Sequence, residues 1–304
     1  MLLCFFLAHC TEQKSHPNIP IADILPNDSI DIAPTGLFSI SSMISVDSSF
    51  FLSSGQSKTV VKTNQRFEVL NRYSAIGRGP FELGDASELT SSEEWVYMID
   101  FSQRKLIEFT HELVPVDEFS VEIPPFSIIS VNDGLLWLGS FDFTREDLYE
   151  IDFGAKDIGP IGELVKTRYP MEGLVSHTKN LSGTLLRYRQ FHYRFDLFRA
   201  DGTHITFTNS TRPERPEVDA SFPGYPVFKS KIHNSAFLTA DRACVLSGDH
   251  TPGNQPVQCF DFDGNLVARY SLKQDPSMIS VYADSTLYTY SPKTNHIYVY
   301  TLGF

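Results

Sequence analysis

The chain has 304 residues and a formal net charge of −12, with 24 Phe and 13 Tyr among its side chains. This length fits either two average domains or one large all-β unit, so it does not decide the domain count. Nucleic-acid binders concentrate Lys and Arg to displace counterions, and the acidic balance therefore argues against a nucleic acid as a partner. The aromatic content of 13% favours strands, because pleated surfaces suit aromatic side chains.

The first ten residues, MLLCFFLAHC, are too few to span a bilayer, which needs about 20 apolar residues. They are typical of the apolar region of a secretory signal. Leu7-Ala8-His9-Cys10 resembles a bacterial lipobox, in which the Cys is lipidated and becomes the first mature residue. We therefore expect a signal and lipobox segment over 1–10, with Cys10 lipidated, and a polar tether over 11–28. A buried N-terminal strand is the alternative interpretation of the leader.

Six segments share one plan: an apolar alternating run, a polar turn, and a second alternating run rich in Tyr, Phe and Ile. They begin at Phe50, Trp95, Leu135, Thr184, Ala243 and Thr286, and successive units lie 40 to 59 residues apart. Further strand-like runs precede and follow these pairs, for example FSISSMISV before the first and RFEVLNRYS after it. Units of this length with four short strands are typical of propeller blades.

The sixth unit lacks an outer strand before Phe304, whereas the strand-like SIDIAP at Ser29–Pro34 belongs to no unit. We therefore predict an all-β protein, a six-bladed β-propeller over 29–304, with four-stranded antiparallel blades and a ring closed by this N-terminal strand. A stacked pair of β-sandwiches is the alternative, and the six-fold recurrence argues against it.

The segment from Ile76 to Thr110 carries the most specific motif. Its IGRGPFELGD is followed by a spacer, an apolar strand ending in Asp100, and a hairpin into a second apolar strand. This resembles the blade pattern of bacterial NHL-like six-bladed propeller proteins, with matches at Gly77, Gly79, Pro80, Glu82 and Asp100. The chain is also similar to the uncharacterised propeller lipoproteins common in Bacteroidetes. Both resemblances imply a fold and an envelope location, and neither implies an activity.

Cys244 and Cys259 flank the polar stretch GDHTPGNQP, whose midpoint lies at residue 251 or 252. In an antiparallel hairpin centred there, the two cysteines face each other, so a cross-strand disulfide is geometrically allowed and fits an oxidising compartment. A pair of unbridged thiols is the alternative, because Cys packs well as a small apolar residue.

If each blade runs from the centre outward, the turns between its second and third strands and the connections between blades emerge on one face, here called the loop-rich face. It collects GRGPFEL at 77–83, the turns around 141–146 and 190–194, the long turn at 248–256 and the insertion at 209–228. We expect a ligand there, although a tolerated surface insertion is the alternative for 209–228. The candidate ligand-binding residues are Arg78, Glu82, Arg189, His192, Arg194, Tyr225 and His250.

The fourth unit holds a cluster of arginines, whose guanidinium groups bind carboxylate or phosphate at two points. The cluster consists of Arg187, Arg189, Arg194 and Arg199, with His192 beside them. An anionic ligand is one interpretation of this cluster. Pairing with the protein's own Asp and Glu is the other.

Catalytic motifs are weak. The nine His show no close metal spacing, and C-x-x-C and G-x-S-x-G motifs are absent from the sequence. Calcium-dependent lactonase and arylesterase propellers hold their ion with Asn, Asp and Glu, and Asn132, Asn180 and Asp284 are of the right type. Each of these adjoins a predicted turn, which explains it without an ion. We expect no metal site and no cofactor, with calcium as the exception to test, and we lean against an enzyme.

The sequence thus favours a non-catalytic lipoprotein of the cell envelope, in the outer membrane or periplasm, that contacts the membrane only through a lipid anchor. Its partner would be a small molecule, a glycan or an envelope protein segment bound on the loop-rich face. A propeller hydrolase or lyase and a structural scaffold of an envelope complex are the alternatives. The residues that line the channel distinguish these functions. Converging carboxylates with a metal would indicate the enzyme, and a pocket lined by aromatic residues and Arg would indicate the binding protein. A channel filled by Phe and Leu would indicate the scaffold.

Overall fold

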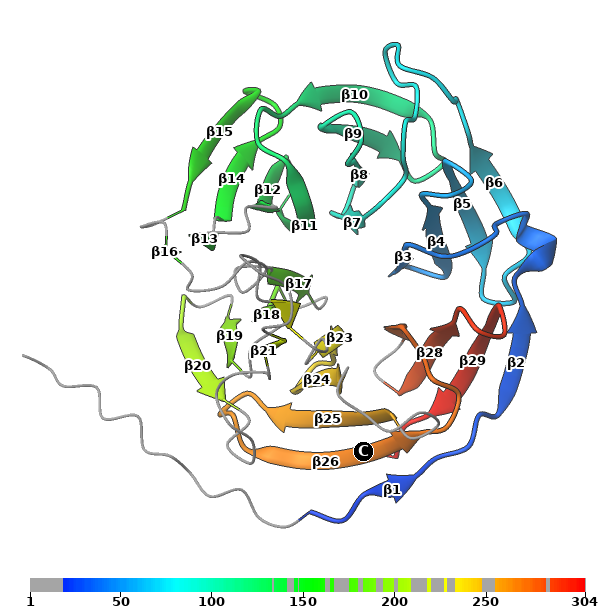
Figure 1. Cartoon of the computed structure of the whole chain (residues 1–304), viewed down its shortest axis with the longest axis vertical. Helices are drawn as coiled ribbons and strands as arrows, with labels where there is room; N and C mark the ends of the chain where they lie inside the picture. Colours follow the sequence, from blue (N-terminus) through cyan, green and yellow to red (C-terminus); the bar gives the residue numbers. More distant parts are fainter. Residues whose placement is uncertain are drawn as a thin grey trace, which may run out of the picture.

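The computed structural model describes residues 19–132, 134–140, 145–146, 148–161, 165–166, 175–179, 183–189, 194–199, 202–208, 218–219, 227–228, 233–247, 255–282 and 285–303. Over these ranges, six sheets of four antiparallel strands stand around a ring as blades (Figure 1). The predicted six-bladed β-propeller is therefore confirmed. No helix in the described ranges is long and apolar enough to cross a membrane, and the helical segment found there is the short turn Ala33–Thr35.

The strands of each blade follow the chain from the centre outward, except that the outermost strand of blade six comes from the N-terminal side. Blade one consists of β3 (Ser42–Val46), β4 (Ser49–Ser54), β5 (Thr59–Asn64) and β6 (Val69–Tyr73). Blade two consists of β7 (Leu89–Ser91), β8 (Trp95–Asp100), β9 (Lys105–Thr110) and β10 (Pro115–Ser120). Blade three consists of β11 (Pro125–Asn132), β12 (Leu135–Ser140), β14 (Leu148–Asp152) and β15 (Asp157–Pro160).

Blade four consists of β17 (Val175–Lys179), β18 (Leu185–Arg189), β19 (Arg194–Phe198) and β20 (His204–Thr208). Blade five consists of β23 (His233–Leu238), β24 (Arg242–Ser247), β25 (Gln255–Asp261) and β26 (Leu266–Leu272). Blade six consists of β27 (Met278–Tyr282), β28 (Thr286–Ser291), β29 (His296–Thr301) and β2 (Asp28–Asp31). Two short ladders lie outside the blades, β13 (Arg145–Glu146) with β16 (Val165–Lys166) and β21 (Val218–Asp219) with β22 (Val227–Phe228).

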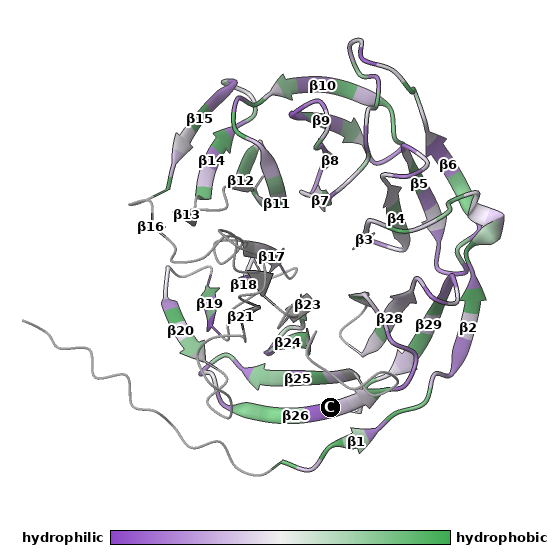
Figure 2. Cartoon of the chain, in the orientation of Figure 1, coloured by the Kyte–Doolittle hydropathy of each residue, from purple (hydrophilic) through white to green (hydrophobic). Residues whose placement is uncertain are grey.

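Apolar side chains on alternating positions hold neighbouring blades together. Phe50 and Leu52 of β4 face blade six, whereas Phe51 between them faces blade two. Because both faces of these strands are covered by neighbouring blades, their sequences are nearly continuous apolar runs. The outermost strands are more exposed and mixed in hydropathy, and β6 exposes Val69 and Leu70 as well as Arg72 (Figure 2). Buried apolar clusters of this kind join every pair of neighbouring blades except three and four, as far as the described residues show.

The ring closes as the sequence predicts. β2 pairs antiparallel with β29, and Ile30 lies opposite Ile297. Ile32, just beyond the strand, is fully buried in the cluster between blades six and one. The outer strand of the last blade is therefore supplied by the N-terminal side of the chain, which leaves no open edge at that point of the ring.

A second N-terminal strand joins blade five. β1 (Ala22–Asp23) pairs in parallel with β26, along its outer edge (Figure 1). Ile24 then packs against the cluster between blades five and six. Part of the segment expected to be a tether is thus in contact with the propeller.

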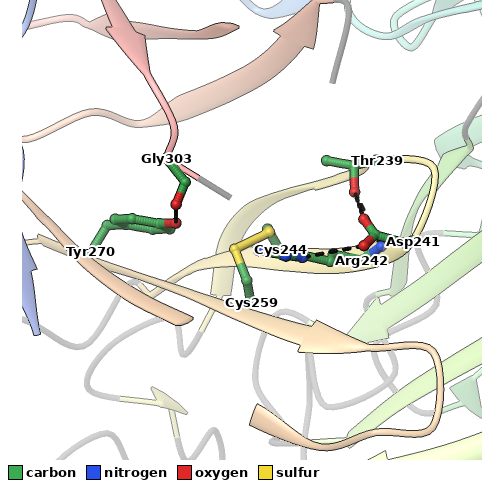
Figure 3. Close-up of a disulfide and its surroundings, with 7 residues drawn as sticks. All are labelled: Thr239, Asp241, Arg242, Cys244, Cys259, Tyr270 and Gly303. Atoms are coloured by element: carbon green, nitrogen blue, oxygen red, sulfur yellow. Dashed lines mark hydrogen bonds and ion pairs between the residues drawn. A yellow bond between two sulfur atoms is a disulfide. The ribbon is translucent and has the colours of Figure 1, made fainter. Parts of the chain in front are cut away.

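A disulfide joins Cys244 and Cys259, which lie directly opposite each other in β24 and β25 (Figure 3). Both residues are fully buried in the cluster between blades five and six. The hairpin register expected from the sequence is the observed one. Nearby, the Tyr270 hydroxyl donates to the Gly303 carbonyl oxygen at 3.2 Å, which ties the end of the described chain to blade five.

Candidate functional site

A cavity of about 300 Å³ opens at the centre of the ring on the loop-rich face. Its residues come from the beginnings of the innermost strands of blades one to four and from the turn after β8, which all lie on that face. We call it the inner cavity. It is lined by three serines, Ser41, Ser87 and Ser176, by the carboxyl groups of Asp85 and Glu88, and by the rings of Phe101 and Phe126.

Glu88 is the unusual member of this set. It directly precedes β7, the innermost strand of blade two, and its backbone carbonyl accepts from Ile99 N–H at 2.9 Å. Burial raises the pKa of its carboxyl group to about 8, and no hydrogen bond or opposite charge from the described residues offsets this effect. Near neutral pH the group is therefore largely protonated, so it can both donate and accept a hydrogen bond.

Tyr188 of β18 interacts electrostatically with Glu88, although it belongs to blade four. Burial raises the pKa of the Tyr188 phenol, and the Glu88 carboxyl group raises it further. The Tyr188 hydroxyl also forms hydrogen bonds with Ser176, which lines the cavity, and with Ser235. The Tyr188 phenol is therefore protonated near neutral pH. The described residues around Glu88 are polar, and none of them places a positive charge next to its carboxyl group.

Asp85 is held in place by its own loop. One carboxylate oxygen accepts from Ala86 N–H at 2.7 Å and the other from the Ser87 hydroxyl at 2.7 Å. Gly55, in the turn between β4 and β5, approaches so closely that a Cβ there would lie 2.3 Å from the Asp85 carboxylate. The Gly55 N–H in turn donates to the Ser41 hydroxyl at 2.9 Å. The acidic wall of the cavity is therefore preorganised.

The 77–83 loop beside this wall folds around the Glu82 carboxylate. Gly79 N–H donates to it at 2.7 Å, and a Cβ on Gly77 would lie only 2.0 Å from it. Gln103 fastens the loop from blade two, donating to the carbonyl oxygens of Gly77 and Glu82 at 3.0 Å each. The fully buried Asp100 accepts from Gly84 N–H and from Ser102. These contacts show that the motif residues stabilise the conformation of the loop, so their presence in the sequence does not require a ligand.

A second cavity of about 410 Å³ lies beside this loop, and we call it the outer cavity. Its lining includes two cations from different turns, Lys58 and Arg78. Neither side chain forms a hydrogen bond or an ion pair with a described residue. Arg78, a residue singled out from the sequence, is exposed and available to a ligand.

Comparison with known proteins gives a likeness in structure only. No protein-family model matches the chain, and no curated protein matches it. A member of the DUF4221 family from Bacteroides vulgatus superposes with a TM-score of 0.62 at 8% identity, over 92% of this chain and 97% of that one. A candidate exported protein from Bacteroides fragilis gives a TM-score of 0.57 at 10% identity, over 93% and 94% of the two chains.

Virginiamycin B lyase from Staphylococcus aureus also matches, with a TM-score of 0.54 at 11% identity, over 91% of this chain and 99% of that one. These likenesses show the fold alone. They leave the function to be argued from the side chains of this chain.

Two arginines of the blade-four cluster form ion pairs with Asp196 of the same blade. Arg187 donates through Nε and Nη2 to one oxygen of the Asp196 carboxylate, at 3.1 and 2.9 Å. Arg194 donates to the other oxygen at 3.3 and 3.2 Å, and Thr206 adds a hydrogen bond at 2.7 Å. Asp196 is fully buried. For Arg187 and Arg194 the structure therefore shows the pairing that the sequence left as one of two interpretations.

This network lies where blade four faces blade three. Phe198 of β19 contacts Trp137 of β12 edge to face, with ring centroids 5.5 Å apart, and stacks on His204 at 4.5 Å. Charged and aromatic side chains thus occupy the position at which the other neighbouring blades carry apolar clusters.

Several residues singled out from the sequence lie outside the described residues: Cys10, His192, Tyr225, His250, Asn180 and Asp284. Arg189 and Asn132 have a described backbone, in β18 and β11, but not a described side chain. Their roles stay predictions. Within the described ranges, no group of three or more His, Cys, Asp and Glu side chains is placed to hold a metal ion.

Sequence reasoning missed the residues of the inner cavity. Glu88 follows the motif in the run GDASELTSSEE, which reads as a polar spacer. Alignment of the six units on their innermost strands could have found it, because the cavity residues lie within one residue of the strand starts. Ser41 and Glu88 directly precede β3 and β7, and Phe126 and Ser176 are the second residues of β11 and β17.

Proposed function

We propose that this chain is a non-catalytic propeller of the bacterial cell envelope that binds a small molecule, glycan or protein segment in the inner cavity. The observation that carries the proposal is Glu88, a carboxyl group in a cavity that the described residues leave without a hydrogen-bond partner. Desolvation in the cavity already raises the pKa of this partly buried carboxyl group, and a ligand that supplies a hydrogen-bond partner there would be bound favourably. Phe101 and Phe126 add apolar surface for the same ligand.

Three observations support the envelope location. The leader ends in the lipobox-like Leu7-Ala8-His9-Cys10. The Cys244–Cys259 disulfide fits an oxidising compartment. One similar structure is a candidate exported protein. In this proposal Cys10 carries the lipid, which is the contact with the membrane. Labelling of cells with an alkyne fatty acid should mark the wild-type protein and not Cys10→Ala, and equal labelling would contradict the anchor.

The first experiment is a binding screen by calorimetry with three groups of compounds: short peptides, neutral disaccharides and small organic anions. Glu88→Gln and Phe101→Ala should each weaken binding of any hit, because both side chains line the cavity. Phe101 is 42% exposed, so its truncation should leave the fold intact. Phe38→Ala is the matched control, since Phe38 is 72% exposed and does not line the cavity. Hits that bind all four proteins equally would place the site elsewhere.

A second candidate function, a lyase or hydrolase, is favoured by one feature of the same residue. A carboxyl group with a pKa of about 8 can act as a general acid near neutral pH. Turnover of a bound hit by the wild type, lost in Glu88→Gln with binding retained, would support the enzyme. Binding without chemical change of the ligand would support the non-catalytic proposal.

A further inference from the structure

The inner and outer cavities are neighbours. Asp85 lines the inner cavity and Gly84, the preceding residue, lines the outer one. Phe101 lines the inner cavity and Ser102, the following residue, lines the outer one. Consecutive Cα atoms are about 3.8 Å apart, so the two cavities share a wall that is one residue thick at two points. A ligand in the inner cavity therefore lies next to the outer one.

The two cavities carry opposite charge. The inner one holds the carboxyl groups of Asp85 and Glu88, and the outer one holds Lys58 and Arg78. The nearest acid of the loop, Glu82, is held by Gly79 N–H and does not line the outer cavity. The Gln103 amide is likewise occupied by backbone carbonyls of the loop. Among the described residues, neither cation of the outer cavity forms an ion pair.

Each cavity suits one end of a short peptide. An ammonium group is bound well by carboxyl groups and by phenyl rings, and both kinds of side chain line the inner cavity. A carboxylate is bound well by Arg and Lys, which the outer cavity offers. Volumes of about 300 and 410 Å³ admit more than a single amino acid.

We propose that the ligand is a short peptide with free termini, whose ammonium end lies by Glu88 and Asp85 and whose carboxylate end lies by Arg78 and Lys58. This rests on the proposed function, since it names the ligand class of the same site. The groups that face Glu88 are Asp85 in the cavity and the Tyr188 phenol beyond it, and neither is positive. The peptide ammonium would favour the ionised form of the Glu88 carboxyl group and pair with it.

The test is a chemical cycle with tri-alanine as the probe, in four forms: free, N-acetylated, C-amidated and capped at both ends. Binding is measured by NMR titration at millimolar peptide to the wild type, Glu88→Gln and Arg78→Ala. For the wild type, either cap should weaken binding by about tenfold, because each removes a charge-assisted contact. Glu88→Gln should reduce the effect of the N-terminal cap alone, because Asp85 remains, and Arg78→Ala should reduce the effect of the C-terminal cap alone, because Lys58 remains.

The controls are Glu94→Gln and Arg66→Ala, two exposed residues in the β7–β8 and β5–β6 turns on the opposite face. Both should keep the wild-type response to each cap. Equal binding of all four peptides, a cap effect that the cavity variants leave unchanged, or no binding of free tri-alanine would each overturn the inference. The proposed function is contradicted by a separate result: no compound in the screen binds more weakly to Phe101→Ala or Glu88→Gln than to the wild type.

Discussion

Glu88 and Tyr188 interact electrostatically, although Glu88 directly precedes the innermost strand of blade two and Tyr188 lies on the second strand of blade four. Propeller closure brings blades that are far apart in sequence to a common axis, and this gathers Ser41, Glu88, Phe126 and Ser176 into one cavity. The site is therefore a product of the ring and not of any single blade.

The raised pKa of Glu88 predicts how stability depends on pH. The carboxyl group titrates near 8 in the folded protein and near its ordinary value of 4.5 when unfolded, so the folded state holds the proton more tightly between these values. Stability should therefore fall as pH rises through this window, by at most about 1.4 kcal/mol per pH unit. Urea unfolding of the wild type and Glu88→Gln from pH 5 to 8 measures this, and parallel pH profiles would contradict it.

Loss of the disulfide should destabilise the fold. Cys244 and Cys259 are 15 residues apart, and a cross-link of that span contributes about 3 kcal/mol in the chain-entropy account. Reductant should lower the urea midpoint of the wild type. The Cys244→Ala/Cys259→Ala double variant is the control, because reductant should leave its midpoint unchanged. A wild-type midpoint that does not respond to reductant under unfolding conditions would argue against the cross-link.

Asp196 should be a stability residue of blade four. Removing its carboxylate in Asp196→Ala leaves the Arg187 and Arg194 guanidinium groups without their shared partner, at a cost of about 3–5 kcal/mol. Asp263→Ala is the matched control, since Asp263 is 73% exposed and its pair with Arg199 is worth about 1 kcal/mol or less. Chemical denaturation compares the two variants, and equal losses would show that the buried network is unimportant.

Ring closure predicts a sharp effect of N-terminal truncation. A chain that begins at Gly36 lacks β2 and the fully buried Ile32, so blade six loses its outer strand and a core side chain. It should melt at a lower temperature and with less cooperativity than a chain that begins at Ile19. Indistinguishable calorimetric transitions of the two chains would contradict closure by this strand.

The six strand pairs were predictable because each is buried on both faces between turns, as Phe50, Phe51 and Leu52 illustrate in β4. The closing strand β2 was predictable from the missing outer strand of the last unit. β1 was not, since a two-residue parallel pairing with β26 leaves no periodic pattern.

The candidate site was only partly predictable. The loop-rich face was identified, and Arg78 lines a cavity there. The motif that contains Glu82 is compatible with a ligand site and also with a loop whose own backbone binds the Glu82 carboxylate. The hydrogen bond from Gly79 N–H to Glu82 supports the second interpretation. Glu88 has no local signal, because its chemistry arises from burial among residues of four blades.

The most direct test of the account is the titration of Glu88 itself, followed by NMR of its side-chain carboxyl carbon and assigned by comparison with Glu88→Gln. The free protein should show a midpoint near pH 8. Saturating free tri-alanine should lower that midpoint, because an adjacent ammonium group favours the ionised carboxylate. A midpoint near the ordinary value in the free protein, or one that the peptide leaves unchanged, would contradict the assignment of Glu88 as the ligand-binding group.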